Sequence, residues 1–387
     1  MESDLAFPFP DGVARIVRID ALKGNAFWER AFAGKTKDHR YYELIEETLP
    51  NQFENRYVVL EDRSGKNRAV QPIFFVRQNL VEGVPGKVRA IVDLGRKKFP
   101  RFLTMRVLMV GCAAGEGQLG AIDPNDESWL AQAMPPILLS FAKQERASLI
   151  VWKDFPAKYR SSLTALTQNG YVRVPSMPMT RLRIDYEDFD EYLGQIGYVT
   201  RKGLRRKFRK TERAAKIDME VITDISPHVD EIYPLYRQVH ERSPMKFEVL
   251  TKEFFSAIAH AMPEQARFFI WRQSGKIIAF SLCLISGDTI HDECLGLDYA
   301  VAFDLYLYFY TFRDVIRWAM AQGLRYYSSG PLNYDPKLHL GHELAPLDLY
   351  VVHTKPLLNP IFQLAVKYLE PTRHDPILKE FPNADQV

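Results

Sequence analysis

The pattern of hydrophobic and polar positions is clearest in residues 267–328, where three β-rich runs are separated by short turns. The turns, at residues 274–275 and 286–288, carry Ser-Gly and Ser-Gly-Asp, and such turns between apolar runs are typical of an antiparallel meander. The next segment, LYLYFYTFRDVIRWAMAQG, has apolar residues on more than one face. Its length and its terminal Gly323 predict a mostly buried helix with a glycine C-cap, and the run LRYYSS predicts a further strand.

The first half of the chain repeats this order. A hairpin around residues 64–65 is followed by the strand MRVLMVG, the helix SWLAQAMPPILLSFAKQERA, the strand ASLIVWKDFP, the helix AKYRSSLTALTQNG and the extended segment YVRVPSMPMTRLRI. Because the same α/β unit is used twice, we expect two domains with mixed α/β (α+β) sheets. The acidic stretch DYEDFDEYL separates them, which predicts domains at residues 1–187 and 188–355 and a helical tail at 356–387. Residues 77–104 are interpreted as an insertion.

Composition supports a globular protein of two domains. The chain has 387 residues, of which 47% are hydrophobic and 26% charged, with a formal net charge of +3. No run of about eighteen apolar residues is present, so we expect no membrane span. The acidic first residues do not resemble a secretory signal. The segment NPIFQLAVKYLEP is interpreted as a docking helix.

The three cysteines, Cys112, Cys283 and Cys294, lie far apart and form no CxxC pair. This spacing argues against a disulfide framework and favours a reducing compartment, so we expect a cytoplasmic protein. It also argues against a zinc site, and no pair of histidines stands at metal-ligand spacing with a carboxylate, so we predict no metal.

A strongly basic segment follows the predicted junction. Residues 201–216 hold nine basic residues and the single acid Glu212, and Leu204 and Phe208 form an apolar seam of helical spacing. One interpretation is a solvated helix face. The near absence of acids favours the other, a surface for a phosphate-bearing partner such as a cofactor diphosphate, a nucleotide-linked sugar or an RNA backbone, and we expect no DNA partner.

Glycines form a GxGxxG pattern at Gly115, Gly117 and Gly120, directly after a predicted strand. A dinucleotide-binding fingerprint requires a helix to begin at once, whereas the turn-rich stretch AIDPNDES intervenes here. We therefore interpret the glycines as a loop beside a substrate, since glycine permits close approach of backbone to a ligand.

The last meander strand carries His291, Asp292 and Glu293, and Ser328 and Ser329 end the neighbouring strand. A Ser–His–Asp arrangement stays open, although the chain has no GxSxG motif. His240 and His260 are interpreted as residues of helix faces. The stretch YYSSGPLNYDPKLHLG then places Lys337 and His339 in a loop, either as solvated turn residues or as part of a site.

The order of elements resembles that of the tandem GNAT-fold acyltransferases, which include the Fem-type aminoacyl transferases and related predicted N-acyltransferases. The stretch DYEDFDEYLGQIGYVTRKGLRRKFRKTERAAKIDMEVI is similar to their inter-domain signature, an acidic-aromatic motif before a basic helix that leads into a strand. After Gly330, YDPKLHLG is similar to a short element of the family, with Tyr334, Lys337 and Gly341 in matching positions. The similarity covers roughly residues 30–355.

The resemblance implies transfer of an acyl group from an activated donor to an amine, with acyl-CoA as the expected co-substrate and no tightly bound cofactor. The stretch GLDYAVAFDLY stands where the family's pyrophosphate loop belongs but has a single glycine, so aminoacyl-tRNA or a carrier-protein thioester stays open as the donor. The acceptor also stays open among a lipid-linked sugar, a peptide amine, a polyamine and an amino acid. A non-catalytic module that binds RNA or another polyanion is the alternative.

Residue roles follow from the resemblance. Asp292 or Glu293 is expected to act as general base, with His291 as a competitor, and Lys337 is expected to steady the oxyanion or hold a phosphate or carboxylate. The expected cofactor-binding residues are Arg201, Arg205, Arg209, Tyr334 and Gly330. The expected substrate-binding residues are Gly115, Gly117, Ser329 and His339.

Overall fold

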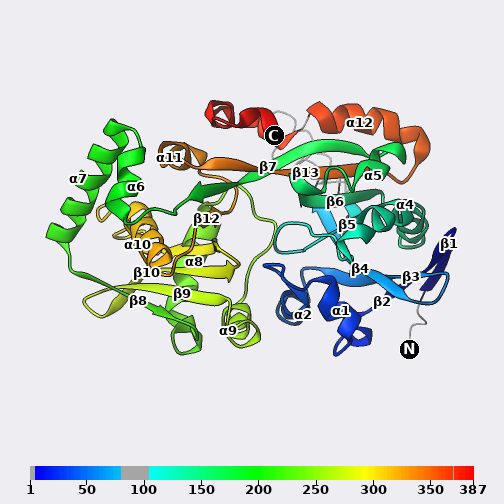
Figure 1. Cartoon of the computed structure of the whole chain (residues 1–387), viewed down its shortest axis with the longest axis horizontal. Coiled ribbons are helices and arrows are strands. Elements are labelled where there is room, and N and C mark those ends of the chain that lie inside the picture. The colour runs from blue at the N-terminus through cyan, green and yellow to red at the C-terminus, as the bar shows by residue number, and fades with distance from the viewer. Residues whose placement is uncertain (1–4, 80–103, 369) are drawn as a thin grey trace, which may run out of the picture. The chain divides into compact units, whose positions relative to one another are not determined.

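The computed structural model describes residues 5–79, 104–368 and 370–387, and it divides into two compact units (Figure 1). Each unit is assembled from separate stretches of the chain. The first comprises Met1–Ala33, Pro50–Ser176 and Leu347–Arg373, and the second comprises Gly34–Leu49, Met177–Pro346 and His374–Val387.

The first unit contains a mixed sheet. Strands β2 to β5 pair antiparallel in sequence order, and β6 then pairs parallel to β5, with Val107 opposite Leu149. Between these two strands the chain forms α4, whose Leu130, Met134 and Phe141 are buried in the core of the unit. Its elements are β1 (Leu5–Phe9), β2 (Gly12–Val17), α1 (Ala26–Ala31), β3 (Glu54–Asp62), β4 (Asn67–Asn79), β5 (Thr104–Val110), α4 (Glu127–Gln144), β6 (Leu149–Pro156), α5 (Thr164–Gln168), the first part of β7 (Val172–Arg183), the second part of β13 (Glu343–His353) and α12 (Asn359–Tyr368).

The second unit repeats this order. Strands β8, β9, β10 and β11 pair antiparallel, α10 follows, and β12 then pairs parallel to β11 and antiparallel to β7. The elements of this unit, in chain order, are α2 (His39–Thr48), α6 (Phe189–Gln195), α7 (Tyr198–Ala214), β8 (Ile217–Ile222), α8 (Val229–Arg242), α9 (Lys252–Ala261), β9 (Ala266–Gln273), β10 (Lys276–Ser286), β11 (Thr289–Leu297), α10 (Leu307–Ala321), β12 (Tyr326–Ser329) and α11 (Tyr334–His339), with the second part of β7 and the first part of β13.

Helices cover both faces of the second unit's sheet. On one face, the ring of Phe280 from β10 packs edge-on against Phe255 of α9 at 5.7 Å. Ser281, the next residue of β10, lies opposite Phe269, whose ring meets Trp318 of α10 at 5.2 Å. Neighbouring residues of a strand point to opposite faces, so α10 covers the face that carries the side chain of Ser281.

The repeat of meander, helix and parallel strand confirms the predicted fold class, a mixed α/β architecture in which one unit is used twice. The meander, the buried helix ending before Gly323 and the basic helix all lie where the pattern placed them. Most of the predicted insertion at residues 77–104 lies outside the described residues.

Two predicted segments differ in detail. The helix expected at residues 157–170 is reduced to α5 after a 3-10 turn at Ala157–Tyr159. The segment after Gly330, expected as a loop, contains the short helix α11. Gly341, just beyond α11, has a φ of 81°, a left-handed conformation that glycine adopts at helix ends with little strain.

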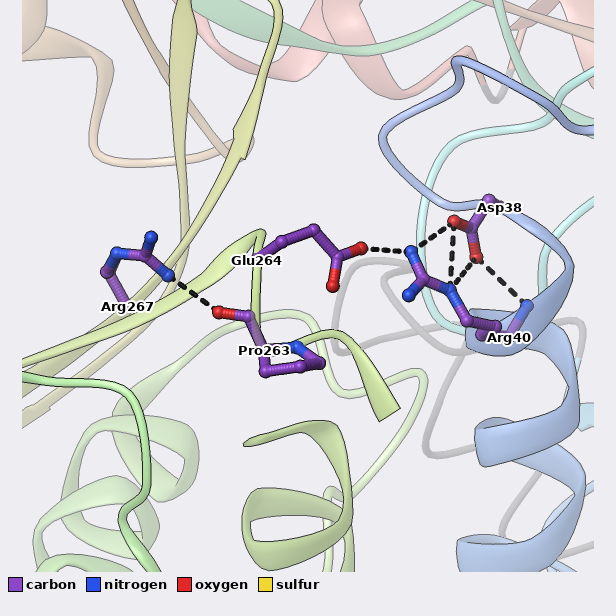
Figure 2. A network of polar contacts seen from close by, with 5 residues as sticks. All are labelled: Asp38, Arg40, Pro263, Glu264 and Arg267. Carbon is purple, nitrogen blue, oxygen red and sulfur yellow. Dashed lines mark hydrogen bonds and ion pairs between the residues drawn. The ribbon is translucent and has the colours of Figure 1, made fainter. Parts of the chain in front are cut away.

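Helix α2 belongs to the second unit although it comes from the first fifty residues. Asp38 caps it by accepting a hydrogen bond from the backbone of Arg40, and the Arg40 guanidinium joins Asp38 to Glu264, which lies between α9 and β9 (Figure 2). Tyr41 packs edge-on against Phe254 of α9 at 6.2 Å. These contacts fix residues 34–49 to the unit that carries the site described below.

Candidate active site

The site lies where β11 and β12 part. Their parallel ladder pairs Thr289–Asp292 with Tyr326–Ser329, and β12 ends at that point, whereas β11 continues to Leu297. A bulge occurs in β11 at the same place, since Asp292 lies opposite Cys283 and Cys294 lies opposite Leu282. The extra residue of the bulge is therefore Glu293. Bulges re-aim side chains and end pairing, and both effects appear here.

Asp292 lies at the centre of a hydrogen-bonded group. Its Oδ1 accepts a hydrogen bond from Ser281 Oγ at 2.5 Å, and its Oδ2 accepts one from the Tyr327 hydroxyl at 2.7 Å. Burial raises the pKa of the Asp292 carboxyl, while the two hydrogen bonds and the nearby charge of Lys337 oppose that rise. A carboxylate whose pKa is raised is a better proton acceptor than a solvent-exposed one.

Lys337, on α11, is buried, with an exposed fraction of 7%. Its Nζ donates a hydrogen bond to the backbone carbonyl of Gly330 at 2.5 Å. Burial lowers the pKa of the ammonium group to about 8, and the charge of Asp292 opposes this fall. The structure therefore brings the predicted residues Lys337, Asp292 and Gly330 into one polar cluster.

A second polar chain adjoins this cluster. Ser329 Oγ lies 3.0 Å from Thr180 Oγ1, and Thr180 Oγ1 lies 3.2 Å from Nδ1 of His342. The His342 ring packs against Tyr327 and Phe312. Burial lowers the pKa of His342 to about 3, with a further contribution from the Lys337 charge, so the ring is neutral at physiological pH.

Glu293 and His291, the other candidates for the general base, contact different residues from those that Asp292 contacts. Glu293 Oε1 accepts a hydrogen bond from Lys37 Nζ at 3.0 Å, and Lys37 is 1% exposed. His291 Nε2 lies 3.4 Å from the hydroxyl of Thr36. Both side chains thus contact the segment before α2, whereas Asp292 contacts β10 and β12.

Two further predicted residues lie on α11. Tyr334 is 2% exposed, packs against Phe381, and donates its hydroxyl proton to the carbonyl of Pro178 at 2.8 Å. Its side chain fastens α11 to the unit, and cofactor contact by Tyr334 remains a prediction. His339 is exposed, with Nδ1 2.8 Å from the carbonyl of Asp335.

Gly115 and Gly117 belong to the first unit. The carbonyl of Gly115 accepts a hydrogen bond from Lys153 Nζ at 3.0 Å, and the backbone of Gly117 donates to Asp154 at 2.9 Å. A Cβ atom on Gly117 would lie 2.6 Å from the Lys153 carbonyl, so glycine is required there by backbone packing. Substrate binding by these glycines remains a prediction.

The predicted arginines of α7 differ in their surroundings. Arg201 donates to the carbonyl of Gly194 and Arg205 pairs with Asp190, both on α6, which stands beside α7 in Figure 1. Arg209 is exposed and forms no ion pair with a described residue. It shares an open hollow of about 510 Å³ with other residues of the helix, namely Arg206, Lys210, Arg213 and Ala214.

Sequence reasoning missed several residues of the site. Ser281, Tyr327 and His342 come from three different strands or loops, and Lys37 comes from the far end of the chain. Only the polarity of Ser281 inside an apolar strand was a signal in the sequence. Among the residues that the structure describes, no group of three or more His, Cys, Asp or Glu could hold a metal ion, and no helix could span a membrane.

Comparison with known proteins bears on the fold. Residues 199–338 match the family model of the acetyltransferase (GNAT) domain. Among solved structures, FemX is 12% identical with a TM-score of 0.53, and the match covers 89% of this chain and 99% of that one. A tandem GNAT protein from the clavulanic acid biosynthesis pathway is 10% identical with a TM-score of 0.51, with the same coverage of 89% and 99%. Likeness at this level of identity shows the fold.

A curated relative is the putative 8-amino-7-oxononanoate synthase 2 of Mycobacterium tuberculosis, which is 23% identical over 271 residues. The match covers 67% of this chain and 34% of the relative, so the chain spans about a third of that protein's length. Residues 199–338 are thus similar to a GNAT acetyltransferase domain, and the chain shares the fold of solved structures that include FemX and a tandem GNAT protein.

Proposed function

We propose that the chain is an N-acyltransferase that moves an acyl group from an activated donor, most simply an acyl-CoA, to the nitrogen of an amine. The observation that carries this proposal is the position of the Asp292 carboxylate. It is held by Ser281 and Tyr327, within electrostatic reach of Lys337, where β11 and β12 part. A candidate base and a candidate cation are then both present where β12 ends beside β11.

In the proposed reaction, the amine nitrogen attacks the carbonyl carbon of the donor. The Asp292 carboxylate takes the proton that the nitrogen loses, directly or through a water molecule. The Lys337 ammonium stabilises the negative charge that develops on the carbonyl oxygen. Collapse of the tetrahedral intermediate breaks the bond to the carrier, which leaves as a thiolate or alkoxide and takes up a proton.

The strand ends supply places for the donor. Beyond Asp292, backbone groups of β11 extend past the end of β12, and they can pair with the amide groups of an acyl arm. The nearby backbone of Gly330 and hydroxyl of Ser329 would contact the acyl end. On α7, Arg209 faces outward and would hold donor phosphates, while Arg201 and Arg205 are engaged with α6 and would orient the helix.

Two donors remain in the proposal. The GNAT domain match favours acyl-CoA, and the similarity to FemX and the basic surface of α7 keep aminoacyl-tRNA as the alternative. The acceptor is an amine of unassigned identity. A cytoplasmic location is also proposed, because the three cysteines form no disulfide among the described residues.

The test is an acyl-transfer screen. Purified protein is incubated with acyl-CoAs or charged tRNAs and with a polyamine, an amino acid and a peptide amine, and the products are weighed by mass spectrometry. We expect one amine to gain the acyl mass while its carrier is released, and Asp292→Asn to abolish the gain. Lys252→Met, which removes an exposed lysine of the same unit, is the matched control. A screen without any acylated amine contradicts the proposal.

A second candidate, a polyanion-binding module, is favoured by α7. Arg206, Arg209 and Arg213 are exposed and form no ion pair with a described residue. Binding of a labelled RNA measured at rising salt separates the two candidates, since phosphate contacts weaken steeply with salt. Tight, salt-sensitive RNA binding without acyl transfer favours the polyanion-binding module. If the variant with Arg206, Arg209 and Arg213 all changed to Ser no longer binds the RNA, the binding surface lies on α7.

A further inference from the structure

The segment before α2 reaches the candidate active site from the far end of the chain. Lys37 Nζ donates to Glu293 Oε1 at 3.0 Å, and the hydroxyl of Thr36 lies 3.4 Å from Nε2 of His291. The exposed fractions of the two charged side chains are 1% for Lys37 and 19% for Glu293. An ion pair so little exposed is weakly screened, and removing one partner of a buried pair is typically destabilising.

Glu293 is the extra residue of the β11 bulge. Asp292 lies opposite Cys283 and Cys294 lies opposite Leu282, so Glu293 has no partner in the ladder with β10. A bulged residue is not held by regular pairing, and its side chain must be fixed by other contacts. The ion pair with Lys37 is one such contact.

Lys37 is itself held in place by α2. The helix begins one residue after Asp38, its N-cap, and Arg40 links Asp38 to Glu264 of the loop between α9 and β9 (Figure 2). Thr251, which caps α9, donates to the carbonyl of Thr48 at the other end of α2. Both ends of α2 thus contact other elements of the second unit. Because Lys37 directly precedes the N-cap of α2, these contacts also fix the backbone of Lys37.

We infer that Lys37 is a positioning residue of the reaction, which holds Glu293 and thereby fixes the β11 bulge and the direction of the Asp292 carboxylate. This rests on the proposed function in which Asp292 takes the proton from the amine. Glu293 then has a structural part, and the base is Asp292. The segment before α2 is, on this view, a component of the site.

Thiol reactivity tests the bulge without any substrate. Cys294 follows the bulge and Cys112 lies in the first unit, and both are buried. Wild type and variants are treated with 5,5′-dithiobis(2-nitrobenzoic acid), and the modified cysteine is identified by peptide mass. We expect Lys37→Met to speed modification of Cys294 roughly tenfold through local opening, with Cys112 unchanged. Lys37→Arg, which keeps the charge, should stay within about twofold of wild type.

Turnover gives the second readout, with the donor and amine found active in the acyl-transfer screen. Lys37→Met should lower kcat roughly tenfold with little change in KM, and Lys37→Arg should restore most of it. If Lys37 acts through Glu293, the double variant Lys37→Met/Glu293→Gln should fall no further than either single variant. Lys252→Met is again the control.

The experiments distinguish a failure of Asp292 as the general base from a failure of Lys37 as a positioning residue. Full turnover in Asp292→Asn would overturn the proposed base while leaving the Cys294 rates to report on the bulge. Wild-type kcat together with wild-type Cys294 reactivity in Lys37→Met would overturn the role of Lys37. Faster modification of Cys294 with unchanged kcat in Lys37→Met would also overturn the role of Lys37. The bulge would then open locally while Asp292 still accepted the proton at the wild-type rate.

Discussion

At the scale of residues, Asp292 and Lys337 form the centre of the proposed chemistry, and each lies in surroundings that disfavour its charge. Burial raises the pKa of the carboxyl and lowers the pKa of the ammonium group to about 8, and each charge partly offsets the effect on the other. Such opposed shifts are frequent where proton transfer takes place.

Lys337→Met tests the cation directly. Loss of one donor to an oxyanion typically slows turnover about 10²- to 10³-fold, and we expect a fall of that size in kcat. The free energy of unfolding should not fall in this variant. Below pH 8 the buried ammonium group of Lys337 destabilises the folded state by on the order of 3 kcal/mol, and Met carries no charge. Steady-state kinetics and urea unfolding at pH 7 measure the two effects. Retained turnover would contradict the role.

The pH dependence of kcat/KM follows from the same two groups. Activity should rise as the Asp292 carboxyl loses its proton, at a pH above the ordinary range of aspartate, and fall above about pH 8 as Lys337 loses its charge. In Lys337→Arg, the fall should move to higher pH, because arginine stays protonated. A rate that keeps rising above pH 9 in the wild type would instead assign the proton acceptor to neutral Lys337.

His342 should make the fold sensitive to acid. Its pKa is about 3 in the folded chain against 6.5 for an ordinary histidine, so unfolding takes up a proton between these values. The free energy of unfolding should therefore fall by a few kcal/mol as pH drops from about 6.5 to 3. His342→Gln removes this term, and urea unfolding at pH 7, 5 and 4 should show a flatter profile. His339→Gln, at an exposed position, is the control.

At the scale of elements, α11 is the short helix that carries Lys337 to the strands. It is fastened through Tyr334 and ends at His339, with Leu340 as its C-cap before the left-handed Gly341. The polar network of Thr180, Ser329 and His342 lies beside it and joins three elements. The position of Lys337 therefore depends on how α11 ends.

Gly341→Ala should test this dependence. A Cβ atom there would lie 3.6 Å from Ile196, which is ordinary contact, so the strain comes from the φ of 81° and amounts to about 1 kcal/mol. We expect a lower free energy of unfolding and a lower kcat. Gly323→Ala has a similar φ of 72° at the end of α10 and open space around it. The Gly323→Ala variant should lose a similar free energy of unfolding and keep its kcat. Equal losses of kcat in the two variants would contradict the dependence of Lys337 on the end of α11.

At the scale of the whole molecule, each unit depends on segments that are distant in sequence. The second unit includes residues 34–49 and 374–387, and Leu378 and Phe381 of the latter pack with Tyr334 and Leu344. A unit assembled in this way is not specified by one continuous stretch of chain.

A fragment of residues 177–346 should therefore fold poorly. It lacks α2 and the segment that packs against Tyr334, so the apolar faces of Phe254 and Tyr334 would be exposed to water. We expect no cooperative thermal transition by circular dichroism, whereas the full chain should show one. A cooperative transition in the fragment would show that the added segments are dispensable for folding.

The sequence by itself determined the local elements and their repeated order. Alternation, turn glycines and the apolar faces of helices depend on neighbouring residues, so they predicted the meander, the buried helix and the basic helix. The same reasoning, with the family resemblance, named Asp292 and Lys337 as candidates.

Only the tertiary structure decided which side chains meet. Ser281, Tyr327 and Lys37 reach β11 from another strand, the parallel strand and a segment about 250 residues away, a separation that no local pattern records. The β11 bulge is likewise visible only in the tertiary structure, because it is defined by the register of β11 against β10.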